Sequence, residues 1–231
     1  MTTFDLRMIA MLCMLCDHFG RTAFPEQIWL TYIGRLAFPI FAYQLAEGYQ
    51  HTRSKHKYAL RLFLFALLSE LPFDLMVYGT LCYWGHQNVM WTLLMGFVSI
   101  WLVDRVLACY SSIPAVTLGF LITFGCFIAA TALRLDYAGL GVLQLMFFYL
   151  FLIRVRCIPA AIFVTVLLNV INPEGSVISI LILQFSSQSI ATLALIPILL
   201  YKGKRGYHSK AWTWFCYVYY PIHMLILSIF G

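Results

Sequence analysis

Predominantly apolar stretches of about 20 residues, the length that crosses a bilayer as an α-helix, recur from one end of this chain to the other. Of its 231 residues, 62% are hydrophobic and 10% are charged, which is far more apolar than an ordinary soluble domain. An α-helix satisfies its backbone hydrogen bonds internally, as a lipid environment demands. The sequence therefore predicts an all-α fold, a polytopic transmembrane helical bundle, in a single domain that covers residues 1–231.

Short polar turns divide the chain into nine predicted spans. Their approximate limits are 4–24, 28–49, 57–78, 88–108, 114–133, 138–153, 157–172, 176–201 and 211–230. The polar run "QFSSQS" inside the eighth span predicts either a hydrogen-bonding seam between helices or a break in the helix.

The Lys and Arg residues between these spans indicate the orientation of the chain. With nine spans and a cytoplasmic N-terminus, most of them fall on the cytoplasmic side, where membrane proteins generally place them. They are Arg53, Lys55, Lys57, Arg105, Arg154, Arg156, Lys202, Lys204, Arg205 and Lys210. The net charge of +6 is thereby explained by topology, and we expect no nucleic-acid partner.

Ionisable residues inside the spans are concentrated in the first third of the chain. Each costs about 2.5 to 3.5 kcal/mol at the centre of a bilayer, so each needs a partner or a function. The first three spans contain Arg7, Asp17, His18, Arg35, Glu47, Arg61, Glu70 and Asp74. We therefore expect the functional site to lie among these three spans.

Within the first span, Arg7 and His18 are eleven positions apart. That separation is almost a whole number of helical turns, so both side chains face one groove, ~16 Å apart along the helix. Arg53, Lys57 and Arg61 fall near the cytoplasmic end of this groove. Such a basic cluster predicts a site for a phosphorylated ligand, and a long thin arm of that ligand would reach His18.

Asp17 and His18 are the candidate catalytic residues, since together they look like an acid and base pair. Neighbours on a helix point ~100° apart, however, and do not face each other. We therefore expect Asp17 to pair with a neighbouring helix, with Arg35 as its candidate partner. Arg35 and Glu47 are also candidates for a structural ion pair between helices.

The last span adds a second imidazole to the predicted interior. His223 follows Tyr219 and Tyr220 by four and three positions, so the three side chains lie near one face, and Pro221 can kink this helix. His223 and Tyr220 are therefore candidates for shaping the site.

Several long segments resemble the TraX family, which is described as a family of F-pilin acetylases of conjugation systems. The segments are "LRMIAMLCMLCDHFGR", "IGRLAFPIFAYQLAEGYQHTRSKHKYALRL", "LPFD", "NVMWTLLMGF" and, in the last span, "YYPIHMLIL". The first span is also distantly similar to that of the bacterial membrane-bound acyltransferases, in which an Arg or Lys, ten intervening residues and a His form a signature that Arg7 and His18 keep.

This resemblance implies an acetyltransferase of the bacterial inner or cytoplasmic membrane. Acetyl-CoA on the cytoplasmic side would be the acyl donor, and a peptide N-terminus, a glycan or a lipid would be the acceptor. His18 would act as the general base, because a neutral imidazole suits proton transfer near neutral pH. Arg35, Asn88 or a tyrosine at 219 or 220 would stabilise the oxyanion of the intermediate.

Two other functions remain open from the sequence. In a small proton-coupled transporter, Arg7, Asp17, His18 and Glu47 would form an ion relay. In a structural component of a conjugation or secretion assembly, the polar residues would only hold helices together. No cluster of residues has metal-ligand spacing, so we expect no metal.

Overall fold

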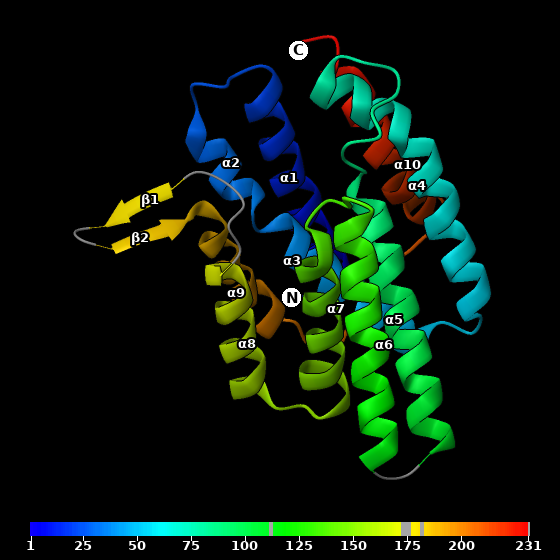
Figure 1. The fold of residues 1–231 in the computed structure, drawn as a ribbon. Coiled ribbons are helices and arrows are strands. Elements are labelled where there is room, and N and C mark those ends of the chain that lie inside the picture. Colours follow the sequence, from blue (N-terminus) through cyan, green and yellow to red (C-terminus); the bar gives the residue numbers. More distant parts are fainter. Residues whose placement is uncertain (111–112, 172–176, 181–182, 231) are drawn as a thin grey trace.

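The computed structural model describes residues 1–110, 113–171, 177–180 and 183–230 (Figure 1), and side chains are described outside 172–185. The chain begins with α1 (Thr3–Thr22), α2 (Ile28–Gly34), α3 (Ala37–His51), α4 (Lys55–Tyr78), α5 (Val89–Cys109), α6 (Ile113–Ala132) and α7 (Ala138–Phe147). It continues with the π-helical η1 (Phe148–Arg154), α8 (Ile158–Ile171), β1 (Val177–Ile180), β2 (Leu183–Ser186), the 3₁₀-helix η2 (Ser187–Ala194), α9 (Leu195–Leu199) and α10 (Lys210–Leu227). The fold is predominantly helical, as predicted.

Local capping groups set the ends of several helices. Thr2 and Asp5 form a reciprocal capping box at the start of α1, in which the Thr2 amide donates to the Asp5 carboxylate at 2.8 Å. Ser54 caps α4, and Gly79, with a left-handed φ of 64°, ends it. Seven of the nine predicted spans accordingly coincide with a single helix, or with α7 continued by η1.

The second predicted span, 28–49, is broken into α2 and α3 at Arg35 and Leu36. Pro39 lies in the first turn of α3, where an amide hydrogen has no helical partner. A helix continuing through this point would bring the Pro39 ring against the carbonyl of Arg35, four residues earlier. The break places Arg35 at a bend, beside the upper part of α1.

The prediction of a helix over 176–201 is wrong. Its described residues form an antiparallel hairpin of β1 and β2, then η2 and the short α9. The "QFSSQS" run has both properties considered from the sequence: Ser186 caps a 3₁₀-helix, and buried Gln188 donates to Asn169 of α8 at 3.3 Å. Ser and Gln offer the backbone and the neighbouring helix alternative hydrogen bonds, which explains the irregular structure.

Helices α1 to α5 and α10 surround the interior that contains the candidate site. Helix α1 packs against α2, α3 and α10, while α4 packs against α5 and α10 (Figure 1). The N-terminal amino group donates to the Leu200 carbonyl at 2.9 Å, and the Thr3 amide donates to the Lys204 carbonyl at 2.8 Å. The start of α1 and the basic turn 202–206 therefore lie side by side.

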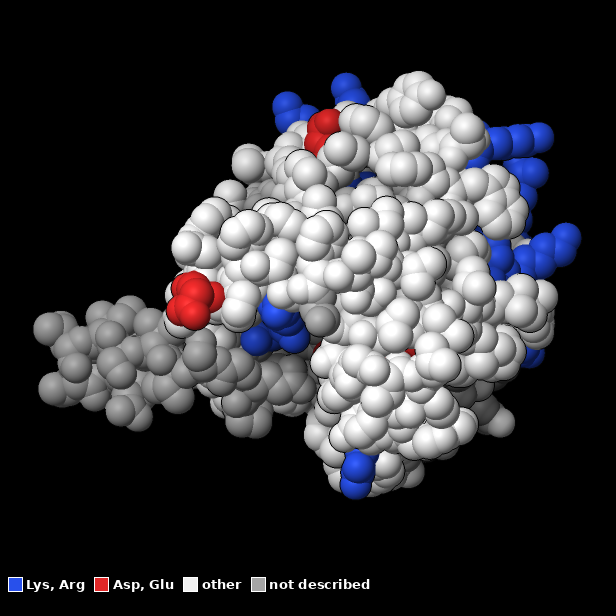
Figure 2. Space-filling model, turned by 90° about the horizontal axis from the view of Figure 1, so that it is seen from above, with Lys and Arg blue, Asp and Glu red and all other residues white. Residues whose placement is uncertain are grey.

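Two helices within the described residues, α5 and α6, are long and apolar enough to cross a membrane. Large apolar side chains on α6 point outward, with Val116 67% and Phe120 66% exposed, and Leu68 of α4 is 59% exposed. Seen from above, most of the surface consists of residues other than Lys, Arg, Asp and Glu (Figure 2). These observations fit a lipid environment, whereas the predicted count of nine spans is not confirmed.

Candidate functional site

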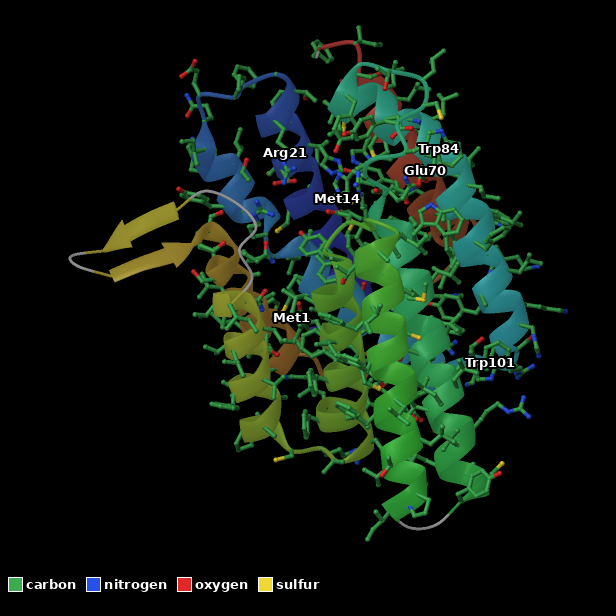
Figure 3. The ribbon with its side chains drawn as sticks, in the orientation of Figure 1. Met1, Met14, Arg21, Glu70, Trp84 and Trp101 are labelled. Carbon is green, nitrogen blue, oxygen red and sulfur yellow. The ribbon has the colours of Figure 1, made fainter. Side chains whose placement is uncertain are left out.

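A cavity of about 80 Å³ surrounds His18 near the upper end of α1. We call it the His18 cavity; helices α1 to α5 and α10 all contribute to its wall. Figure 3 shows Arg21 at this end of α1 and Met14 lower along the same helix. The wall is formed by Met14, Asp17, His18, Arg21, Gly34, Arg35, Ala37, Phe38, Phe41, Phe73, Met76, Val77, His86, Val89, Leu93, Asp136, Tyr137 and Tyr220.

His18 is hydrogen bonded to the histidine of the last helix. Its Nδ1 lies 2.7 Å from Nε2 of His223, and the two rings are almost parallel, with an interplanar angle of 3°. Nδ1 of His223 lies 2.7 Å from the carbonyl oxygen of Tyr219, one turn earlier in α10. The sequence placed each imidazole in the interior, and the fold brings them into direct contact.

Asp17 pairs with Arg21 of its own helix and not with Arg35. The Arg21 Nε and the Asp17 Oδ2 are 3.0 Å apart. The predicted partner, Arg35, is therefore wrong. Residues four positions apart on one helix are already neighbours, so the pair with Arg21 needs no contact with a second helix. Asp17 nevertheless lines the same cavity as His18, although the side chains of neighbouring residues on a helix point ~100° apart.

Arg35 is buried, 8% exposed, and its Nε has no hydrogen-bond partner among the described residues. It lines the His18 cavity beside Gly34. A Cβ at position 34 would lie 2.2 Å from the Asp17 Cβ, so only glycine permits this approach of α2 to α1. The bend between α2 and α3 thus brings to the cavity a guanidinium group whose Nε has no hydrogen-bond partner among the described residues.

Three residues at the far wall of the His18 cavity were not identified from the sequence. His86 Nε2 lies 3.5 Å from Asp136 Oδ1, and His86 Nδ1 lies 2.8 Å from the Tyr78 hydroxyl. The Tyr137 ring stacks on Phe38 of α3 at 3.9 Å between centroids. These residues belong to turns between helices, where a sequence carries no periodic signal that would place them near His18.

A larger cavity, about 340 Å³, lies at the opposite end of α1. We call it the basic cavity because its wall includes Arg7, Arg61, Arg205, His51 and His208. None of the three arginines forms an ion pair with a described carboxylate. Arg61 instead lies over the Tyr58 and Tyr217 rings, 5.3 Å and 5.7 Å from their centroids.

The one carboxylate in the basic cavity wall among the described residues is that of Glu47. It accepts a hydrogen bond from the Tyr201 hydroxyl, which also contacts the Thr3 hydroxyl at 2.9 Å. Glu47 therefore connects α3 to the basic turn and the start of α1, and the alternative of an Arg35–Glu47 ion pair is wrong.

Three other predicted residues lie outside the cavities. Arg53 and Lys57 are exposed and do not line the basic cavity, where Arg205 is found instead. Asn88 is completely buried: its side-chain oxygen caps α5 at the Met90 amide and its nitrogen donates to the Ala66 carbonyl at 2.9 Å. Asn88 thereby fixes α5 to α4, and its donor is already used.

A third cavity of about 160 Å³, lined mostly by apolar side chains, lies between the two and shares part of its wall with each. It shares Arg7, Gln44, Tyr58, Thr213 and Tyr217 with the basic cavity, and Met14, Phe41, Val89, Leu93 and Tyr220 with the His18 cavity.

The three cavities form a row, and one face of α1 contributes to the wall of each. From the basic cavity to the His18 cavity, this face presents Arg7, Met11, Met14 and His18. The structure thus places Arg7 and His18 on a common groove, as their spacing predicts.

Comparison with known proteins places the chain in a family. Residues 4–230 match the model of a family described as TraX protein. A stretch of 76 residues is 33% identical to the "Probable fimbrial assembly protein FimC, serogroup H1" of Dichelobacter nodosus, and the match covers 31% of this chain and 31% of the length of that relative. No solved structure matches. Because the family model extends over nearly the whole sequence, the chain belongs to the TraX protein family.

Proposed function

We propose that this protein is an integral-membrane acetyltransferase that moves an acetyl group from acetyl-CoA to an amine or hydroxyl acceptor, which is a peptide N-terminus, a glycan or a lipid. The observation that carries the proposal is the row of three cavities along α1. The basic cavity, the mostly apolar cavity next to it and the His18 cavity match, in that order, the phosphates, the pantetheine arm and the thioester of acetyl-CoA.

The basic cavity has the residues that a nucleotide phosphate group needs. Arg7, Arg61 and Arg205 carry positive charges without carboxylate partners among the described residues, and arginine binds phosphate through paired hydrogen bonds. The same wall contains aromatic rings, among them Phe4 and Trp212, which are 4.9 Å apart between centroids. A planar base can stack on such rings.

His18 is the proposed general base. An acceptor amine or hydroxyl would give its proton to the imidazole while its nitrogen or oxygen bonds to the acetyl carbon. The CoA sulfur would leave with the electrons of the C–S bond and take that proton from the imidazolium, which returns His18 to its neutral form. Arg35, whose Nε has no hydrogen-bond partner among the described residues, and Tyr220 line the same cavity, and either can donate to the negative oxygen that forms. Asp17, which lines the cavity in its pair with Arg21, would support the site without touching His18.

We place the protein in the bacterial inner or cytoplasmic membrane as a multi-pass protein with its N-terminus inside. The two long apolar helices and the outward-facing apolar side chains of α4 and α6 support this placement. The basic cavity would then open on the cytoplasmic side, where the positively charged turn at 202–206, which includes Arg205, would lie and where acetyl-CoA is made.

A second function is favoured by one comparison. The relative from Dichelobacter nodosus is named as a fimbrial assembly protein, and a non-catalytic role in assembling a pilus would need neither acetyl-CoA nor His18. Proton-coupled transport would use the same row of cavities but would not consume acetyl-CoA. Acetyl transfer therefore separates the first proposal from both alternatives.

The decisive experiment is to incubate the purified protein, reconstituted in lipid nanodiscs, with radiolabelled acetyl-CoA and a membrane extract that contains acceptors. We expect the His18→Ala variant to lose acetyl transfer by about 10²- to 10⁴-fold, which is what a general base contributes. His56→Ala is the matched control, since His56 is exposed and packs against Trp101 away from the cavities. Equal turnover in both variants and the wild type would remove His18 from the mechanism.

A further inference from the structure

The hydrogen bonds around the two buried histidines define which ring nitrogen carries each proton. The Tyr219 carbonyl oxygen can only accept a hydrogen bond, so Nδ1 of His223, 2.7 Å away, must be the donor. In a neutral His223 the other nitrogen, Nε2, is then an acceptor. Nδ1 of His18, 2.7 Å from that acceptor, must therefore carry its hydrogen.

This chain of two hydrogen bonds leaves one nitrogen free. With its hydrogen on Nδ1, a neutral His18 has an unprotonated Nε2, and His18 lines the cavity whereas His223 does not. Nε2 of His223 is already used as an acceptor, so His223 itself is not available as a base. Of the two histidines, only His18 can take a proton from a molecule in the cavity.

We propose that His223 is a positioning residue, which holds His18 in the tautomer that has its hydrogen on Nδ1 and its basic Nε2 free. The role of His18 as a base rests on the proposed function, but the tautomer does not. When His18 takes up a proton at Nε2, the Nδ1 hydrogen remains bonded to a strong neutral acceptor. This is the role that a carboxylate has in many catalytic triads, filled here by an imidazole that adds no charge to the interior.

The surroundings of the pair support a fixed arrangement. The Tyr219 ring stacks on His223 at 4.9 Å with an interplanar angle of 16°, and the Tyr220 ring lies 5.9 Å from His223 and 6.5 Å from His18. His223 is 6% exposed. No described carboxylate forms a hydrogen bond with either imidazole, so His223 is the group that sets the His18 tautomer.

Two substitutions at position 223 separate positioning from packing. In His223→Gln, the amide oxygen can reach the position of Nε2 and accept the hydrogen from His18. In His223→Leu, a side chain of similar bulk offers no acceptor. We expect both proteins to remain folded, as judged by gel filtration and thermal unfolding of the purified proteins.

The first measurement is the ¹⁵N NMR spectrum of protein labelled at histidine, with the His18 signals assigned by their loss in His18→Ala. The shifts of the two ring nitrogens report which one carries the hydrogen. We expect one tautomer with hydrogen on Nδ1 in the wild type and in His223→Gln, and a mixture of both tautomers in His223→Leu. A single unchanged tautomer in His223→Leu would overturn the proposal.

The second measurement is acetyl transfer. We expect His223→Leu to lower kcat by about 10- to 100-fold, as loss of an orienting partner typically does, with KM for acetyl-CoA unchanged, and His223→Gln to restore most of kcat. If the wild type transfers no acetyl group, the proposed function fails while the spectrum still decides the tautomer. If transfer occurs and His223→Leu is as active as the wild type, the positioning role fails alone.

Discussion

The charged side chains in the basic cavity and in the His18 cavity, at the two ends of the row, differ in whether they have partners of opposite charge. At the basic cavity, Arg7, Arg61 and Arg205 have no described carboxylate partner and border about 340 Å³ of space. At the His18 cavity, about 80 Å³ in volume, Asp17 pairs with Arg21, and Arg35 and Asp136 add one further charge of each sign to the wall. In the proposed function, the basic end would receive the charged part of the donor, and the other end would hold a neutral base among nearly balanced charges.

Under the proposed acetyl transfer, this difference would divide binding of the donor from the chemical step. Unpaired arginines gain free energy when an anion arrives, because charge-assisted hydrogen bonds are the strong ones. A base that works near neutral pH needs a defined orientation more than it needs a nearby charge. Substitutions at the basic end should therefore change binding of the donor, whereas those at the His18 end should change turnover.

The largest effect expected at the basic end comes from removing its arginines. A charged hydrogen bond contributes about 1.5 to 3 kcal/mol, so Arg7→Gln or Arg61→Gln should each raise KM for acetyl-CoA by about 10- to 100-fold and leave kcat nearly unchanged. Steady-state kinetics with labelled acetyl-CoA measures both constants.

Arg105→Gln is the control for this comparison. Arg105 is exposed at the end of α5 and does not line the row of cavities. If Arg7→Gln lowered kcat instead of raising KM, binding and chemistry would not be divided between the two ends.

Local features of this fold could be predicted from the sequence, because helix periodicity acts over a few turns. The limits of α1, α4, α6 and α10 and the common face of Arg7 and His18 all follow from short segments. The i, i+4 spacing of Asp17 and Arg21 was also visible, and it is the signal that would have identified the correct ion pair.

Long-range features could not be predicted in the same way. His18 and His223 are 205 positions apart, and nothing in either segment determines which helices pack together. Arg205 enters the basic cavity only because the turn at 202–206 lies against the start of α1. The helix expected over 176–201 failed because apolar composition alone does not distinguish a helix from a strand.

The structure of the His18 end depends on the close approach of α1 and α2 at Gly34. A substitution with a smaller expected effect tests this contact. In Gly34→Ala the new Cβ would lie 2.2 Å from the Asp17 Cβ, so one helix must move. We expect the free energy of unfolding to fall by about 1 to 3 kcal/mol, measured by thermal unfolding in detergent.

The matched control for this substitution is Gly125→Ala on α6, where a Cβ would meet no described atom within 4 Å. Alanine in a helix is slightly more stable than glycine, so this variant should be at least as stable as the wild type. A loss of stability shared by both variants would mean that the contact between Gly34 and Asp17 is not the cause.

The smallest effect is expected for Asp17→Asn, which tests whether the balanced charges at the His18 end take part in the chemistry. Asp17 pairs with Arg21, and His18 keeps its own partner in His223, so turnover should stay within about threefold of the wild type, less than 1 kcal/mol. Stability should fall by about 0.5 kcal/mol, as for other i, i+4 pairs. Arg21→Gln should cause the same loss of stability, and the double variant should lose no more than either single variant, because both substitutions remove one interaction. A fall in turnover as deep as that of His18→Ala would instead make Asp17 a catalytic residue, and the His18 end would then work through a charged pair.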